Sequence, residues 1–160
     1  MSNSKAIADA LAARFTGVTA TVGTTTESIT VGPTASLPNG ITAGPALLVF
    51  HPSGELSIGV SKLRQDILEY RVKLLRDPQS LPSRSDWLYA WYDAIRDRIE
   101  MDMDLGLSYV AWARPASVRI ELGGETYPPV LVNGVAQQDF DVVDLTVQIR
   151  LNEVVSTVAP

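Results

Sequence analysis

The chain has 160 residues, 46% of them hydrophobic and 19% charged, and this length and composition predict one folded domain with a single core. It has no cysteine, which excludes disulfide bonds, thiolate nucleophiles and cysteine-ligated zinc. Thirteen basic residues against eighteen acidic ones give a formal net charge of −5, the wrong sign for a protein that grips nucleic acid through its phosphates.

Uninterrupted apolar stretches are short. Ala46 to Phe50 is a typical one, far below the roughly 20 residues that a membrane-spanning helix needs. The N-terminus also lacks the apolar segment of a secretory signal. We therefore expect no membrane contact and no export.

A short amphipathic helix is predicted near the N-terminus. Ser4 precedes apolar residues at a spacing of four, and Gly17 supplies a stop. The apolar residues are Ile7, Leu11 and Phe15. Because about three turns are too few to be stable alone, this helix is expected to pack on a sheet.

Residues 16–45 are rich in Thr, Gly and Pro, and Glu27 is their only charged side chain. Alternation over residues 18–22 and again over residues 29–31 predicts two short strands. Turn signals follow at Gly32-Pro33, at residues 37–40 and at residues 43–45, and they predict a long connection. Loops of this length are functional or mobile in many proteins, although an inert surface loop is the open alternative.

The next part predicts a hairpin and a long strand. The apolar run over residues 46–50 ends in His51-Pro52-Ser53-Gly54, which is typical of a tight turn. Apolar and charged residues then alternate from Ile67 to Arg76, which favours a strand with one core face and one charged face. A helix over residues 62–77 is the competing interpretation, since several of these residues also fit a spacing of three to four.

The clearest helix is predicted from about Asp86 to Met101, with Ser83 or Ser85 as its cap and Gly106 as a late stop. Its apolar residues fall on one arc, so the helix should lie over a sheet. Its acidic residues fall on the opposite arc: Asp86, Asp93, Asp97, Glu100 and Asp104.

The remaining residues predict strands. Alternation over residues 117–122 runs into Gly123-Gly124, a two-residue hairpin signal. Residues 145–152 alternate in the opposite phase to Phe140 and Val142, and this slip predicts a β-bulge near Val143. The whole pattern predicts a single α+β domain over residues 1–160, with a mostly antiparallel sheet packed by a short N-terminal helix and one longer amphipathic helix.

No residue pattern predicts catalysis, a metal site or a cofactor. His51 has no second histidine to work with, so we expect a turn residue and not a base. The acidic stripe of the helix is expected to face solvent, with an electrostatic contact or a channel surface as the alternative. Trp87 and Tyr89 lie off the apolar arc, and exposed aromatic side chains are enriched at protein interfaces.

The order of elements and one segment carry a resemblance to a known family. The segment is the proline-bounded strand from Pro45 to Pro52, with the later strand that ends in Arg76-Asp77-Pro78. Together with the N-terminal helix, the Thr/Gly-rich region and the amphipathic helix, it resembles tail terminator or neck proteins of long-tailed bacteriophages.

The resemblance implies a ring of about six copies that caps the head-proximal end of the tail tube and ends its polymerisation. The ring would join the tube protein to the head connector or stopper protein, with DNA only as passing cargo, in a virion assembled in the host cytoplasm. The family has no catalytic residues, and an acidic lumen would keep DNA from sticking. Interface candidates are Leu37, Pro38, Asn39, Ile41, Pro52, Trp87 and Tyr89, and candidates for an acidic surface or lumen are Asp93, Asp97, Glu100 and Asp104.

Other functions stay open at this point. The chain could be another head–tail connector component or a tail tube subunit, and a tube subunit would stack into long tubes. A small binding module would use the Thr/Gly-rich loop to contact a ligand. An enzyme would have to work with carboxylates, among them Asp93, Asp97 and Glu100.

Overall fold

A computed structural model of the chain describes residues 3–38, 41, 45–50, 67–77, 83–101, 104–127 and 138–151. Within these residues, two helices and seven strands make up an α+β fold, as the sequence predicts. In chain order these are α1 (Asn3–Arg14), β1 (Thr19–Val22), β2 (Thr25–Ser28), β3 (Val31–Thr34), β4 (Ala46–Phe50), β5 (Ile67–Arg76), α2 (Arg84–Met101), β6 (Val110–Tyr127) and β7 (Gln138–Leu151).

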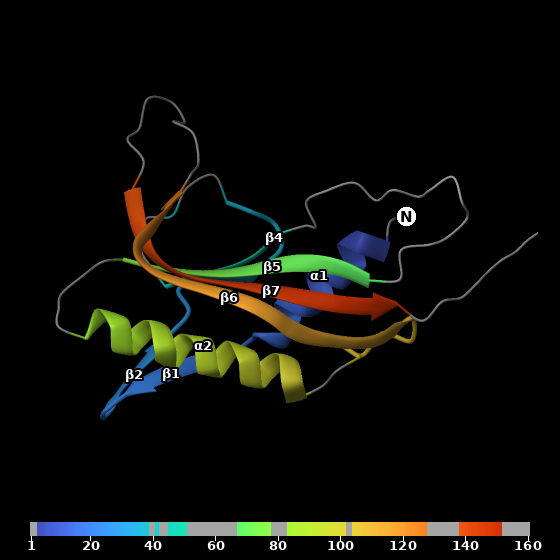
Figure 1. Cartoon of the computed structure of the whole chain (residues 1–160), viewed down its shortest axis with the longest axis horizontal. Helices are drawn as coiled ribbons and strands as arrows, with labels where there is room; N and C mark the ends of the chain where they lie inside the picture. The colour runs from blue at the N-terminus through green and yellow to red at the C-terminus, as the bar shows by residue number, and fades with distance from the viewer. Residues whose placement is uncertain are drawn as a thin grey trace, which may run out of the picture.

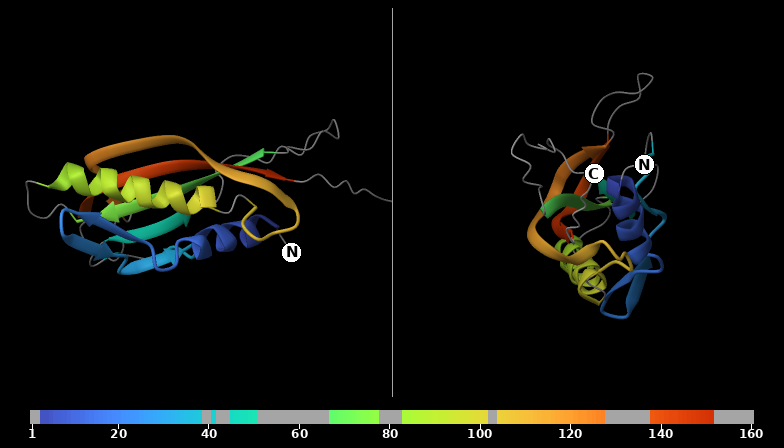
Figure 2. Two further views of the ribbon diagram at one scale, coloured as in Figure 1. Left: turned by 90° about the horizontal axis from the view of Figure 1, so that it is seen from below. Right: turned by 90° about the vertical axis from the view of Figure 1, so that its right-hand side faces the viewer.

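Five strands form the main sheet, in the order β3-β4-β5-β7-β6. All neighbours are antiparallel except β3 and β4, while β1 and β2 form a separate hairpin. Both helices and the hairpin cover one face of the main sheet, with α2 below β6 and β7 in Figure 1 and α1 alongside β3 and β4. The view from below in Figure 2 shows α1, α2 and the hairpin side by side in this layer.

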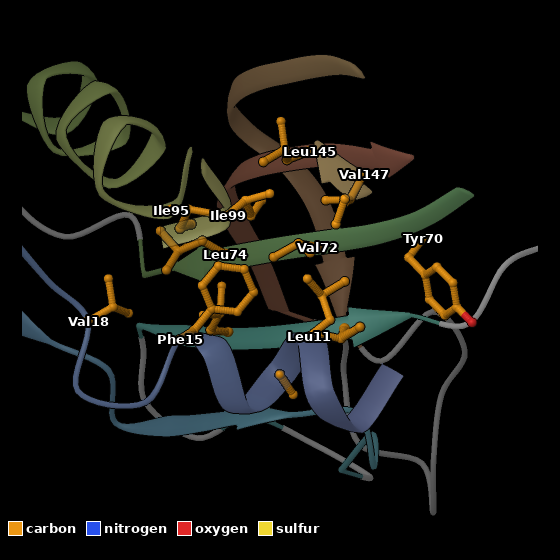
Figure 3. Close-up of a cluster of buried hydrophobic side chains, with 14 of the residues drawn as sticks. Leu11, Phe15, Val18, Tyr70, Val72, Leu74, Ile95, Ile99, Leu145 and Val147 are labelled. Atoms are coloured by element: carbon orange, nitrogen blue, oxygen red, sulfur yellow. The ribbon is translucent and has the colours of Figure 1, made fainter. Parts of the chain in front are cut away.

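The N-terminal helix packs as expected. Ile7, Leu11 and Phe15 are fully buried. Figure 3 shows Leu11 of α1, and Phe15 just after the helix, pointing toward Val72 and Leu74 of the sheet. Ile95 and Ile99 of α2 approach the same cluster from the other helix. This main core therefore lies between the helical layer and one face of the sheet.

A second, smaller apolar cluster lies on the opposite face of the sheet. It contains Phe140 and Val142 of β7, whereas Val143, Leu145 and their alternate neighbours belong to the main core. The pairing of β7 with β5 runs without interruption from Ile67↔Arg150 to Arg76↔Asp141. The predicted bulge near Val143 is therefore wrong, because the change of phase marks a strand that is buried on both faces.

The predicted hairpin at Gly123-Gly124 is also wrong. The strand β6 continues through both glycines to Tyr127, with a register irregularity between Glu121 and Glu125. The backbone N–H of Gly123 donates to Oδ1 of Asp141 on the neighbouring strand at 2.7 Å. The two glycines thus make a bulge in a continuous strand, which places Asp141 beside the main chain of β6.

Two predictions in residues 16–45 also need correction. The second short strand is β2 at Thr25–Ser28, because Gly23 turns the chain at a φ of 63° so that β2 pairs back on β1. Gly32-Pro33 is part of β3, the edge strand beside β4, and does not form a turn. The described residues of this region thus contain three short strands.

The helix α2 begins and ends close to its predicted bounds. The backbone N–H of Trp87 donates to the carbonyl oxygen of Ser83 at 3.0 Å, which makes Ser83 the N-cap residue. The helix ends at Met101, so Asp104 lies beyond it in a turn where its Oδ1 accepts the N–H of Gly106 at 2.8 Å. No helix in the described part of the chain is long and apolar enough to cross a membrane.

Candidate protein interface

The predicted interface residues of the Thr/Gly-rich region differ in exposure. Leu37 is 42% exposed, whereas Ile41 is 6% exposed and belongs to the second cluster. The hydroxyl of Tyr127 donates to the carbonyl oxygen of Pro38, which ties this segment to the end of β6. Leu37 is thus available to a partner, while Ile41 is a core residue; Asn39, His51 and Pro52 lie outside the described residues.

The two aromatic candidates on α2 also differ. Trp87 is 8% exposed, and the guanidinium of Arg76 lies 5.1 Å from the centroid of its ring. The expectation that Trp87 is exposed is wrong because this side chain, four residues before Trp91, extends the buried face of the helix. Tyr89 is 60% exposed on the opposite side of the helix and remains a candidate contact.

The acidic stripe surrounds a single arginine. Arg96 lies within ion-pair distance of Asp93 at 3.5 Å, Asp97 at 3.6 Å and Glu100 at 3.7 Å. All three carboxylates are more than half exposed, so these pairs stabilise the helix little. Three carboxylates and one guanidinium leave this surface acidic, and Asp104 does not belong to it.

No group of acidic residues or histidine in the described residues has the arrangement of a metal site. The carboxylates of the stripe are solvent exposed around one guanidinium. This arrangement can attract a basic protein surface or repel a polyanion such as DNA. Its carboxylates are exposed, whereas catalytic acids and bases are commonly buried beside a charged partner.

A buried ion-pair network that the sequence did not predict lies where α2 begins. Asp141 is fully buried and accepts hydrogen bonds from Nε of Arg84 at 2.9 Å and Nη2 of Arg84 at 2.5 Å, besides that from Gly123. Burial by itself would raise the pKa of this carboxyl, but the hydrogen bonds from Arg84 and Gly123 outweigh it and hold the pKa below its usual value. Asp141 therefore stays ionised and fixes the first turn of α2 to the sheet.

The same network ties the β1–β2 hairpin to β5 and α2. Glu27, the only charged residue between residues 16 and 45, accepts from Nε of Arg76 at 3.0 Å and from the indole Nε1 of Trp91 at 2.7 Å. Arg76 and Asp141 are cross-strand partners on β5 and β7. Side chains from β2, β5, β7 and α2 thus meet in one polar cluster at this end of the main core.

A second network lies on the other face of the sheet. Asp144 is buried between two guanidiniums, that of Arg71 with Nε at 3.0 Å and that of Arg119 with Nη2 at 3.3 Å. Glu125 accepts from Nζ of Lys73 at 2.6 Å and from Nη2 of Arg119 at 2.8 Å. Lys73, Asp144 and Arg119 are register partners on three adjacent strands, so charges of opposite sign lie next to one another on this face.

The outer edge of β6 is the longest strand edge in the described sheet. This 18-residue strand stands last in the strand order, and among the described strands only β7 pairs with it. Its apolar residues Val118 and Leu122 are 41% and 50% exposed. An unpaired edge with exposed apolar side chains is a surface on which another strand can add.

Comparisons of the chain with protein-family models, with curated proteins and with solved structures find no match.

Proposed function

We propose that this chain is a structural subunit of the head–tail junction of a long-tailed bacteriophage. Six copies would form a ring that caps the head-proximal end of the tail tube, ends its polymerisation and docks the head connector, with DNA passing through the lumen. The resemblance of the element order and of the Pro45–Pro52 segment to tail terminator proteins is the starting point.

The observation that carries the proposal is a pair of different exposed apolar positions on opposite sides of the sheet. Tyr89 projects from α2, in the helical layer. Leu37 is also exposed, and it comes directly before Pro38. The carbonyl oxygen of Pro38 accepts a hydrogen bond from Tyr127, which belongs to the second apolar cluster on the other face of the sheet. A ring needs a heterologous interface, in which one surface of each subunit meets a different surface of its neighbour. Tyr89 on one side and Leu37 on the other supply two such surfaces.

The charge of the α2 surface supports the passage of DNA. Asp93, Asp97 and Glu100 outnumber the single Arg96 among them, and all are solvent accessible. A channel wall that repels phosphates lets a duplex slide without binding. We place this surface toward the lumen.

Negative-stain imaging of the largest species of the purified protein tests the proposal. We expect closed rings whose central hole is on the order of 20 Å or more, wide enough for duplex DNA. Long open tubes would instead favour a tail tube subunit. Particles without a central hole would contradict both.

A further inference from the structure

We propose that the outer edge of β6 pairs with the same edge of a second copy, in an antiparallel two-fold dimer centred on Ile120. The inference does not depend on the phage proposal. It concerns a strand edge on which no further described strand pairs, and a residue pattern that complements itself.

Ser117–Glu121 is the longest stretch of β6 whose pairing with β7 is regular. The pairing of β6 with β7 is irregular between Val110 and Trp112, between Pro115 and Ser117, and between Glu121 and Glu125. Bulges and prolines are devices that keep edge strands from pairing along their length. Between the second and the third irregularity, Ser117–Glu121 pairs residue by residue with β7, so a further strand can add in this window in regular register.

The side chains of this window alternate between the two faces of the sheet. Val118 and Ile120 lie opposite Leu145 and Val143 of β7, on the face of the main core. Arg119 lies opposite Asp144 on the other face, and Glu121 follows Arg119 on that face, with Nη1 of Arg119 at 3.2 Å from Oε1 of Glu121. The side chains of Arg119 and Glu121 are 36% and 50% exposed, so both are accessible to a neighbouring strand.

An antiparallel pairing centred on Ile120 pairs Arg119, Ile120 and Glu121 within the regular window and reaches Leu122 just beyond it. Arg119 of each copy falls opposite Glu121 of the other, and Val118 falls opposite Leu122. The four charges then alternate in sign on one face, and the exposed apolar side chains cover one another on the other face. Cross-strand pairs of opposite charge and of apolar side chains are those that stabilise antiparallel sheets.

Neighbouring symmetric registers are unfavourable. Centring the pair on Arg119 places two guanidiniums opposite each other, and centring it on Glu121 does the same with two carboxylates. Like charges directly opposite destabilise a strand pair. The charge pattern therefore selects a second copy of this chain as the occupant and Ile120 as the centre.

Cysteine cross-linking tests the register of the strand pair directly. Because the chain contains no cysteine, any disulfide must form between the introduced residues. Ile120→Cys places the two thiols opposite each other across the two-fold axis, within reach of a disulfide. Ser117→Cys is the matched control, since the two Ser117 positions are offset by six residues, roughly 20 Å at about 3.4 Å per residue. Under mild oxidation we expect a covalent dimer from Ile120→Cys and none from Ser117→Cys. Equal cross-linking of both variants, or none from folded Ile120→Cys, overturns the proposal.

A charge reversal tests the same pairing without a cysteine. Glu121→Arg places an arginine opposite Arg119 of the second copy, and we expect the dimer dissociation constant from sedimentation equilibrium to rise at least tenfold. Glu69→Arg makes the same charge change at an exposed position on the same face of the sheet, two strands away, and should leave the constant unchanged. A parent chain that forms no dimer, or equal effects of the two reversals, contradicts the proposal. Because a two-fold contact closes after two copies, failure of this test leaves the head-to-tail ring untouched.

Discussion

Tyr70 links β5 to the start of α1. Its side chain is fully buried on β5, and its hydroxyl donates to the carbonyl oxygen of Ser4 in the first turn of α1 at 2.9 Å. Figure 3 shows its ring at the edge of the cluster, with the hydroxyl directed away from the apolar side chains. Burial raises the pKa of Tyr70 to about 12, so the folded protein holds the phenol proton well above the usual pKa of 10.0.

The raised pKa of Tyr70 predicts a loss of stability in alkali. Above pH 10 the unfolded chain releases the phenol proton while the folded chain retains it, so the free energy of unfolding falls as pH rises from 10 toward 12. Tyr70→Phe should cost about 1 kcal/mol at neutral pH through the lost hydrogen bond and should remove about 2 kcal/mol of the alkaline decline.

Urea unfolding from pH 7 to pH 12 measures both effects of Tyr70→Phe. Tyr89→Phe is the control, because the exposed ring of Tyr89 should give the pH profile of the parent. An alkaline decline of Tyr70→Phe that parallels the parent would show that Tyr70 does not cause it.

The charged residues of the site show what a sequence can and cannot predict. The acidic arc of α2 follows from helical periodicity, and Asp93, Asp97 and Glu100 lie where that periodicity places them. The contacts of Asp141 and Asp144 do not follow, because they depend on which strands are neighbours and in which register. For Glu27 the sequence offers one signal, which is that it is the only charged residue in a Thr/Gly-rich region. A charge buried in such a region requires a partner of opposite charge or a hydrogen-bond donor.

At the scale of elements, local periodicity predicted α1, β5 and α2, because each presents a repeating face to a core. A continuous apolar run predicted β4, which is buried on both faces. Prediction from local periodicity failed where contacts between residues distant in sequence determine the structure. The same alternation change that indicates a bulge also arises in a strand buried on both faces, as in β7. Gly123-Gly124 has the composition of a hairpin turn, yet pairing with β7 on both sides keeps the strand continuous.

The edge strand β3 depends on a glycine at its second position. Gly32 has a φ of 90°, and a Cβ atom at this position would lie 2.4 Å from the carbonyl oxygen of Leu47 on β4. An alanine would be strained and would also push the two strands apart. Gly32 therefore allows β3 to approach β4 closely.

Gly32→Ala should lower the free energy of unfolding by roughly 3 kcal/mol, through backbone strain and the clash with β4. Gly23→Ala is the matched control: its φ is 63°, but nothing lies within 4 Å of the added Cβ atom. The control should cost only the strain, about 1 kcal/mol. Chemical denaturation of both variants measures the difference, and equal losses would contradict the steric argument.

At the scale of the whole molecule, the ring requires surface residues that serve assembly and not folding. Tyr89 and Trp87 separate the two roles on a single helix, since Tyr89 is 60% exposed and Trp87 is 8% exposed. Tyr89→Ala should leave stability within about 0.5 kcal/mol of the parent and reduce the fraction of assembled protein. Trp87→Ala should lower stability by about 3–5 kcal/mol.

Size-exclusion chromatography and thermal unfolding of the same samples measure assembly and stability together. Ser85→Ala is the matched control for assembly, because Ser85 is exposed one helical turn before Tyr89. A Tyr89→Ala protein that assembles like the parent at every concentration would remove Tyr89 from the interface.

The solution mass of the purified protein, measured by light scattering over a concentration series, tests the ring most directly. Six copies of the 17.3 kDa chain weigh about 104 kDa, and two such rings paired through β6 weigh about 208 kDa. We predict a species at one of these two masses that does not grow further as concentration rises. A dimer through β6 alone would stop at about 35 kDa. A mass that stays at 17.3 kDa, or that stops at the dimer, at all concentrations would contradict the ring.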